Sequence, residues 1–382
     1  MQRGDGGVTP NEDGDRLRRE ARDGQDIVQT PLPSHAVDQD ICPTLQRRPD
    51  VAVHVRPLPL GRISKPWAEF AADHGGSWQS DPSHIRVTRL RHLLNGRLFA
   101  FEAFAQAGPV RGQKIAQCLV SVRGSRMTFI DGLQIADGFA TARPVILQQI
   151  LAFLPAGHLT YGWSWSLEDV PLEDFQQIPG TSNHQSRDVI VHSVNLSHWD
   201  SWDSYYRSIS NNVRRNVKRA EQAETPVEII HATGLAALRL IPDLVQMRRH
   251  TMDRVDFDHP MWRMALSYGA NIAVMPHRCH IAIARQGAKP LAGLFGYEFG
   301  RTFYYWHGGS VDANNGAAWK LLTDMVGLWR EKHPDGQFVM GYFDETLPGY
   351  RREGLHRQRE SLRKSDYMTR LISLDWMPAN DG

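Results

Sequence analysis

The sequence predicts an α/β protein: two tandem αβ units with mixed sheets, preceded by a disordered N-terminal arm. Two observations support this prediction. The order of strands and helices expected in residues 51–195 recurs in residues 196–376, with small residues at the same intervals. Residues 1–50 contain no Phe, Tyr or Trp and carry seven Arg against ten acidic residues. Such a segment has too little apolar surface to offset the entropy lost on ordering.

The composition is typical of a globular protein in a reducing compartment. The 382 residues are 41% hydrophobic, enough for about two domains. Three cysteines are too few for a disulfide framework. There is no long apolar stretch and no secretion signal, so we expect a cytoplasmic protein without a membrane span. The net charge is +2, and the arm's −3 leaves +5 on residues 51–382, which favours an anionic partner.

Apolar alternation and turn residues predict the elements of the first unit. Its strands are expected at 98–104, 115–122, 126–130 and 159–163. Gly124 lies in the turn between the second and third of these strands. Pro144 suits the first turn of a helix that ends near Leu154. Residues 167–186 are polar and are expected to form a loop-like connection.

The second unit repeats this order. Its strands are expected at 279–284, 291–299, 302–307, 338–343 and 367–374. A helix is expected at 316–332, and a helix at 202–224, a strand at 227–231 and a helix at 235–249 precede the repeat. The shared spacing is that of Ala116, Gly124 and Gly132 in the first unit and of Ala292, Gly300 and Gly308 in the second. Together these features predict a duplicated αβ unit.

The helix expected at 202–224 carries one basic face. Apolar residues form a stripe at helical spacing, and Arg214, Arg215, Lys218 and Arg219 fall outside it. Arg214 is set against Lys218, and Arg215 against Arg219, and like charges four residues apart are unfavourable unless an anion compensates them. The face is therefore either an anion-binding site or a solvated helix surface.

Residues 210–221 resemble the basic helix of the Fem-type aminoacyltransferases and related GNAT-fold acyltransferases. The hairpin expected at 291–307 resembles the family's hairpin with its aromatic second strand. The loop at 308–312, the following helix, and the strand that ends in Tyr342-Phe343-Asp344 extend the resemblance. It covers about residues 196–375 in motifs, and 55–195 in element order alone.

The resemblance implies two GNAT-like domains, at 51–195 and 196–376, in one amide-forming N-acyltransferase. It implies a donor that is an aminoacyl-tRNA or an acyl-thioester such as acyl-CoA, and no tightly bound cofactor. The acceptor would be the amine of a small-molecule or nucleotide-linked compound. The sequence leaves open a nucleic-acid-binding or non-catalytic protein that uses the basic helix, and it does not indicate the oligomeric state.

The family binds the donor at the start of a helix, with the pattern Arg/Gln-x-x-Gly-x-Gly/Ala. The matching segment is Asn315, Gly316, Ala317 and Ala318. Backbone N–H groups and the helix dipole favour phosphate at such a position. Ala313 stands where Arg or Gln is expected, which weakens the case for coenzyme A. Ordinary capping by Asn315 and packing by Gly316 are the alternative.

Four residues are candidates for catalysis by the chemistry of their side chains. Asp344 follows a predicted strand and could take the proton of the attacking amine, or be a loop carboxylate in water. Tyr342 and Tyr305 could donate a proton to the leaving group, or be core aromatics. His307 stands beside Gly308-Gly309, where a backbone can approach a ligand, or is a plain strand-end histidine.

Tyr350-Arg351 matches the place where Fem-type enzymes carry an aromatic residue followed by Lys. A cation at Arg351 could stabilise the oxyanion of the tetrahedral intermediate, although Arg does not shuttle protons. Further along, Arg357, Arg359, Arg363 and Lys364 are expected to form a second basic surface or to be solubilising charge. No metal is expected, because His277-x-Cys279-His280 lacks a second ligand pair.

Overall fold

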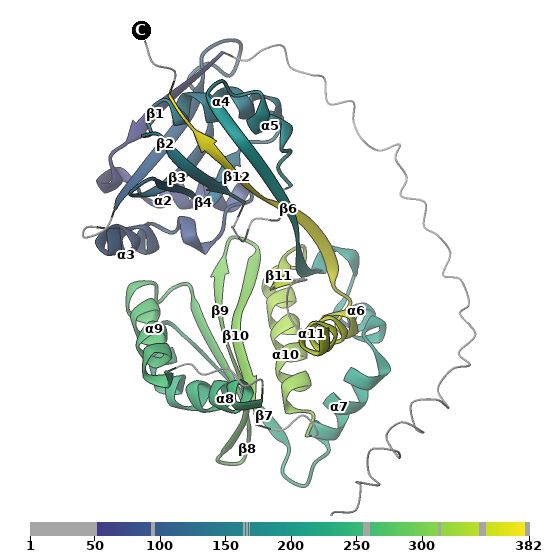
Figure 1. The fold of residues 1–382 in the computed structure, drawn as a ribbon. Helices are drawn as coiled ribbons and strands as arrows, with labels where there is room; N and C mark the ends of the chain where they lie inside the picture. The colour runs from purple at the N-terminus through teal and green to yellow at the C-terminus, as the bar shows by residue number, and fades with distance from the viewer. Residues whose placement is uncertain are drawn as a thin grey trace, which may run out of the picture. The chain divides into compact units, whose positions relative to one another are not determined.

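The computed structural model describes residues 52–92, 96–162, 165, 167, 169–254, 260–311, 315–343 and 349–378. Within these residues, twelve strands form one mixed sheet in the order β1-β2-β3-β4-β5-β12-β6-β11-β10-β9-β8-β7 (Figure 1). The α/β class with mixed sheets is confirmed. The predicted arm, 1–50, lies outside the described residues.

The first αβ unit contributes the strands from β1 to β5. Its elements are β1 (Val53–Leu58), α2 (Lys65–Asp73), the 3-10 helix η2 (Trp78–Ser80), α3 (Pro82–His92), β2 (Arg97–Ala105), β3 (Lys114–Arg123), β4 (Arg126–Ile135), α4 (Arg143–Leu151) and β5 (Gly157–Tyr161). Strands β1 to β4 are antiparallel neighbours, whereas β4 and β5 are parallel. Helix α4 makes the crossover that a parallel pair requires. α5 (Glu173–Gln176) and β6 (Thr181–Asn195) then lead to the second unit.

The second αβ unit has the same order after one additional pair of helices, α6 and α7. Its elements are α6 (Trp202–Ser208), α7 (Asn211–Glu221), β7 (Val227–Thr233), the 3-10 helix η5 (Gly234–Leu240), α8 (Ile241–Arg254), α9 (Met261–Val274), β8 (Cys279–Gln286), β9 (Lys289–Phe299), β10 (Thr302–Ser310), α10 (Ala317–Lys332), β11 (Gln337–Phe343), α11 (Gly349–Ser361) and β12 (Ser365–Trp376). α10 and α7 pack on one face of this part of the sheet, and α8 and α9 on the other.

The predicted repeat is confirmed in detail. The turn glycines Gly124 and Gly300 both have φ of +57°, a left-handed conformation that glycine adopts without strain. Two residues after each turn glycine the second strand of the hairpin begins parallel pairing: Arg126–Thr128 pairs with His158–Thr160, and Thr302–Tyr304 with Gln337–Val339.

The two units exchange strands where they meet. β12 is antiparallel to β5 of the first unit and to β6, while β6 is also antiparallel to β11 of the second unit. Figure 1 shows the C-terminal strand crossing back to the first unit beside β6. The division into domains at residues 195 and 196 remains a prediction, and a strand from beyond it completes the sheet of the first unit.

Two expected elements differ from the structure. The helix expected at 202–224 is two helices, because the Ser210 side chain caps a new one: its Oγ accepts a hydrogen bond from Val213 N at 3.3 Å. The connection expected at 167–186 contains α5 and the first residues of β6. These polar residues form a strand because β12 supplies backbone partners far along the chain. β1, α2, α3, α9 and α11 were not predicted.

Candidate active site

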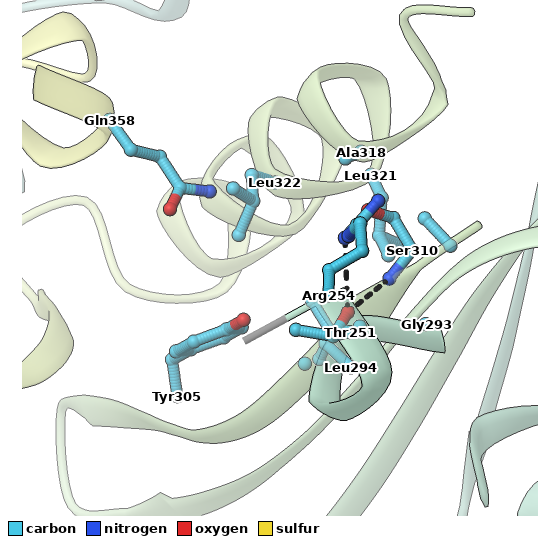
Figure 2. A pocket seen from close by; sticks show the side chains of 13 residues that line it. Thr251, Arg254, Gly293, Leu294, Tyr305, Ser310, Ala318, Leu321, Leu322 and Gln358 are labelled. Carbon is cyan, nitrogen blue, oxygen red and sulfur yellow. Dashed lines mark hydrogen bonds between the residues drawn. The ribbon is translucent and has the colours of Figure 1, made fainter. Parts of the chain in front are cut away.

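A cavity of about 230 Å³ opens where β10 and β11 cease to pair (Figure 2). A bulge between Tyr305 and His307 redirects β10, and another between Val339 and Gly341 redirects β11. Gly341 has φ of +90°, which an L side chain rarely adopts. The two strands therefore diverge and leave a space beside the first turns of α10.

The cavity has an apolar floor and polar residues around it. Leu294 of β9 and Leu321 and Leu322 of α10 form apolar lining. The lining residues with polar side chains are Thr251, Arg254, Tyr305, Ser310 and Gln358. Figure 2 shows them approaching from α8, β10 and α11, three elements distant in the sequence. Such a space suits an apolar chain that ends in a polar, reactive group.

Tyr305 is the predicted site residue that the structure places most clearly at the cavity. Burial raises the pKa of its phenol, and the nearby Arg248 offsets part of that rise. The phenol therefore stays protonated at neutral pH and has a proton to donate. It suits the role of proton donor to a leaving group and does not suit that of a base.

Helix α8 holds the end of β10 in place, which the sequence did not predict. Thr251 Oγ1 accepts a hydrogen bond from Ser310 N at 3.0 Å. Arg254 donates to Ser310 Oγ at 3.2 Å, and Arg248 donates to Gly308 O at 2.9 Å. The run of cations in this helix is the signal in the sequence, but nothing local links it to a strand some 60 residues later.

Arg359 of α11 supports the other side of the cavity. It donates to the carbonyls of Met340, Gly341 and Tyr342 at 2.7 to 3.1 Å and to His192 Nδ1 at 3.1 Å. Burial lowers its pKa to about 10, so it stays charged at neutral pH. Assigning Arg359 and Lys364 to a basic surface was wrong. Arg359 is buried, and the Lys364 side chain is only 3% exposed and pairs with Glu360 and Asp366.

His307 and Tyr342 do not line this cavity. His307 faces α9, where its Nδ1 lies 3.0 Å from Tyr268 Oη. Tyr342 packs against Trp165, with ring centroids 5.4 Å apart, and burial raises the pKa of its phenol. Tyr350 and Arg351 lie in the first turn of α11. Asp344 lies outside the described residues.

Each residue at the start of α10 has a different environment. Asn315 precedes Gly316, the N-cap of α10, and its Oδ1 accepts a hydrogen bond from the first N–H of the helix, Ala317 N, at 2.9 Å. Gly316 has φ of +77°, and a Cβ there would lie 2.2 Å from the Asn216 carbonyl oxygen of α7. Gly316 thus allows α10 to pack closely on α7. Ala317 is fully buried, whereas Ala318 lines the cavity.

The basic face of α7 lies next to the start of α10, because Gly316 packs on Asn216. Asn211, Arg214, Arg215 and Lys218 line a shallow surface depression there. Arg214 donates to Asn211, and Arg219 donates to Asn216 at 3.5 Å. In the described part of the chain, no carboxylate pairs with Arg215 or Lys218, which are exposed. The predicted anion site and the predicted donor site are therefore neighbours.

The described residues hold no cluster of three or more His, Cys, Asp or Glu arranged to bind a metal ion. None of the helices in the described ranges is both long and apolar enough to cross a membrane.

Comparisons with known proteins agree with this geometry. Residues 207–326 match the model of the acetyltransferase (GNAT) domain. The crystal structure of FemX is 10% identical, with a TM-score of 0.62 over 84% of this chain and 96% of that one. A conserved protein of unknown function from Bacteroides thetaiotaomicron is also 10% identical, with a TM-score of 0.52 over 85% of this chain and 100% of that one. No curated protein matches the sequence.

The matched domain identifies residues 207–326 as a GNAT acetyltransferase domain, and the likeness to solved structures shows that the rest of the chain shares a tandem fold of this class. Within that class, the chain resembles the Fem-type aminoacyltransferases, as its basic helix and second hairpin predicted.

Proposed function

We propose that this chain is a cytoplasmic N-acyltransferase that moves an acyl or aminoacyl group from an activated donor to the amine of a small-molecule or nucleotide-linked acceptor. The observation that carries the proposal is the cavity between β10 and α10, which lies beside the start of α10 and close to the basic face of α7. The apolar floor would hold the acyl group. The donor's phosphates would lie on Arg215 and Lys218.

The reaction forms one amide bond and breaks one thioester or ester bond. The amine nitrogen attacks the acyl carbon, and the tetrahedral oxyanion collapses with loss of the thiolate or of the ribose oxygen. Tyr305, kept protonated by burial, would give its proton to that leaving group. In this proposal Asp344 accepts the proton of the attacking amine, and Arg351 stabilises the oxyanion.

Two donors fit the anion-binding elements, an acyl-CoA and an aminoacyl-tRNA. Asn315 already occupies the N–H of Ala317, which leaves less of the helix start for a pyrophosphate. The exposed cations of α7 form an open surface suited to a larger polyanion. We therefore favour a tRNA or a carrier-bound donor over free acyl-CoA.

The experiment is a mass-spectrometric screen of acyl-CoAs and charged tRNAs, each mixed with the full chain and a panel of amines. We expect a product whose mass equals that of the acceptor amine plus the carboxylic acid of the acyl group, minus one water. Binding of a tRNA donor should fall steeply with salt. The variant Arg215→Ala/Lys218→Ala should reduce the slope by about one logarithmic unit for each phosphate that the protein no longer binds.

Two results would contradict parts of this proposal. Nucleic-acid binding without acyl transfer from any donor would favour the alternative of a binding protein that uses the basic face. Normal turnover by Arg215→Ala/Lys218→Ala at every salt concentration would make that face a solvated surface. The matched control is Arg123→Ala/Arg126→Ala, which removes two exposed cations from the hairpin of β3 and β4 in the first unit.

A further inference from the structure

Helix α9 is apolar on both its sides. Its inner side buries Met264, Tyr268 and Ile272 in the core. Its outer side exposes Trp262, Leu266, Ala270 and Ala273, which recur at the spacing of one helical face. Trp262 is 64% exposed and Leu266 65%. A surface helix of a soluble protein normally turns a polar side outward, so this side needs an explanation.

The 3-10 helix η5 extends the apolar surface. It runs beside α9, and its Ala237 and Leu240 share one buried cluster with Met264 and Tyr268 of that helix. Leu235 and Leu238 of η5 are 61% and 40% exposed. We call the exposed residues of the two helices the α9 face, namely Trp262, Leu266, Ala270, Ala273, Leu235 and Leu238. Contiguous exposed apolar residues of this kind mark an interaction surface.

The charged side chains of η5 and α9 themselves are all positive. Neither η5 nor α9 contains an Asp or Glu, and the exposed Arg239 and Arg263 are their cations. The Arg263 guanidinium lies 5.3 Å from the centroid of the Trp262 ring. Helix α3, which contacts α9, also lacks acidic residues and exposes Arg86 and Arg89.

We infer that the α9 face binds an anionic lipid surface. Exposed Trp and Leu side chains enter the boundary between headgroups and acyl chains, and neighbouring Arg side chains bind the anionic headgroups. A second copy of the chain is a poor occupant, because a symmetric contact would bring Arg263 and Arg239 close to their own copies, and neither η5 nor α9 carries a carboxylate to pair with them. An anionic membrane supplies both the apolar interior and the charge that this face lacks.

This inference does not depend on acyl transfer. The α9 face lies outside the cavity lining, and its evidence is exposure and charge. A failure of the lipid experiment would leave the proposed reaction untouched, and the absence of acyl transfer would leave the lipid inference untouched.

The test is flotation of the full chain with vesicles of phosphatidylglycerol and phosphatidylcholine, and with vesicles of phosphatidylcholine alone. We expect binding to the anionic vesicles that weakens with salt. Trp262→Ala/Leu266→Ala should weaken it by roughly tenfold or more. Arg239→Ala/Arg263→Ala should weaken it by roughly fivefold per Arg and remove the preference for anionic vesicles.

The matched control is Phe153→Ala in the first αβ unit, a side chain that is 50% exposed and outside the α9 face. It should bind as the parent chain does. Because all the substituted side chains are exposed, unchanged thermal unfolding is expected and is measured for each variant. The inference is overturned if anionic and neutral vesicles bind equally, if neither binds, or if Trp262→Ala/Leu266→Ala binds normally. A dimer in sedimentation that this variant abolishes would assign the face to a second copy instead.

Discussion

The two αβ units share a hairpin and use it differently. In each, the turn glycine has φ of +57° and the second strand begins its parallel pairing two residues later. The residue seven positions after the turn glycine is Asp131 in the first unit and His307 in the second, and both lie at a bulge. From this point the two hairpins diverge in structure and, we propose, in role.

In the first unit the bulge anchors a segment that docks on the second unit. Asp131 is buried, with φ of +64°, and its Oδ2 accepts hydrogen bonds from Ser77 N at 2.6 Å and Ser80 Oγ at 2.7 Å. This fixes Trp78, whose ring stacks on Tyr297 of β9 with centroids 4.0 Å apart. In the second unit the bulge redirects β10 and opens the cavity. A duplicated scaffold can thus keep one copy for assembly and the other for chemistry.

The largest effect is expected at the start of α10, which distinguishes the second unit. Gly316→Ala would place a Cβ 2.2 Å from Asn216 O at φ of +77°. We expect the free energy of unfolding to fall by about 3 kcal/mol, measured by urea denaturation. The control Asn315→Ala loses only the hydrogen bond from Ala317 N and should cost about 1 kcal/mol. Equal costs for the two variants would show that the close packing on α7 is unimportant.

A second prediction concerns Asp131, the anchor of the first unit. Burial raises the pKa of its carboxyl from 3.8 to about 6, against the hydrogen bonds from Ser77 and Ser80. Its Oδ1 has no hydrogen-bond partner among the described residues. The folded state therefore binds the proton of Asp131 more tightly than the unfolded chain does. The stability that this protonation contributes is complete below about pH 4 and is lost as the pH rises through 6.

Asp131→Asn should remove this dependence. At pH 7 the free energy of unfolding should rise, by up to about 3 kcal/mol for a shift of roughly two pKa units. Urea denaturation at intervals from pH 4 to 7 measures the difference between parent and variant. Burial lowers the pKa of His192 to about 3, so the folded protein loses stability as the pH falls and protonation of His192 becomes favourable in the unfolded chain. This effect is the same in the parent and the variant and does not change the difference between them. A constant difference across this range would contradict the assignment.

The smallest effect on stability is expected for substitutions of the two turn glycines. Gly124→Ala meets nothing within 4 Å, so it should cost about 1 kcal/mol from the left-handed φ alone. Gly300→Ala has the same φ, and its Cβ would lie 3.0 Å from Ala72 Cβ of α2. It should therefore cost more. Denaturation curves of the two variants decide this, and a larger cost at Gly124 would reverse our account of the two turns.

Much of the fold could be predicted because its signals are local. The hairpins follow from apolar alternation around a turn glycine, and α10 from helical spacing before Pro334 and Gly336. The exchange of β6 and β12 could not be predicted, because the polar start of β6 is a strand only through a partner some 180 residues away.

The candidate site, like the fold, could be predicted only in part. Tyr305 and Ala318 lie at the cavity, as their place in the second repeat suggested. Arg254 and Arg359 were missed because their partners are backbone atoms of distant strands, which leave no pattern in the residues around each Arg. From the sequence alone, a basic residue in a helix is expected to be exposed. Only the structure shows which backbone carbonyls accept its hydrogen bonds.

The central claim is that the cavity of the second unit holds the acyl group of the donor. Ala318→Phe tests it most directly, because this partly exposed residue lines the cavity and a phenyl ring would occupy it. Acyl transfer should be measured with the donor and amine found by mass spectrometry, beside Leu328→Phe on the exposed side of α10. We predict a roughly hundredfold loss of turnover for Ala318→Phe with unchanged thermal unfolding, and normal turnover for Leu328→Phe. Normal transfer by a folded Ala318→Phe variant would contradict the account.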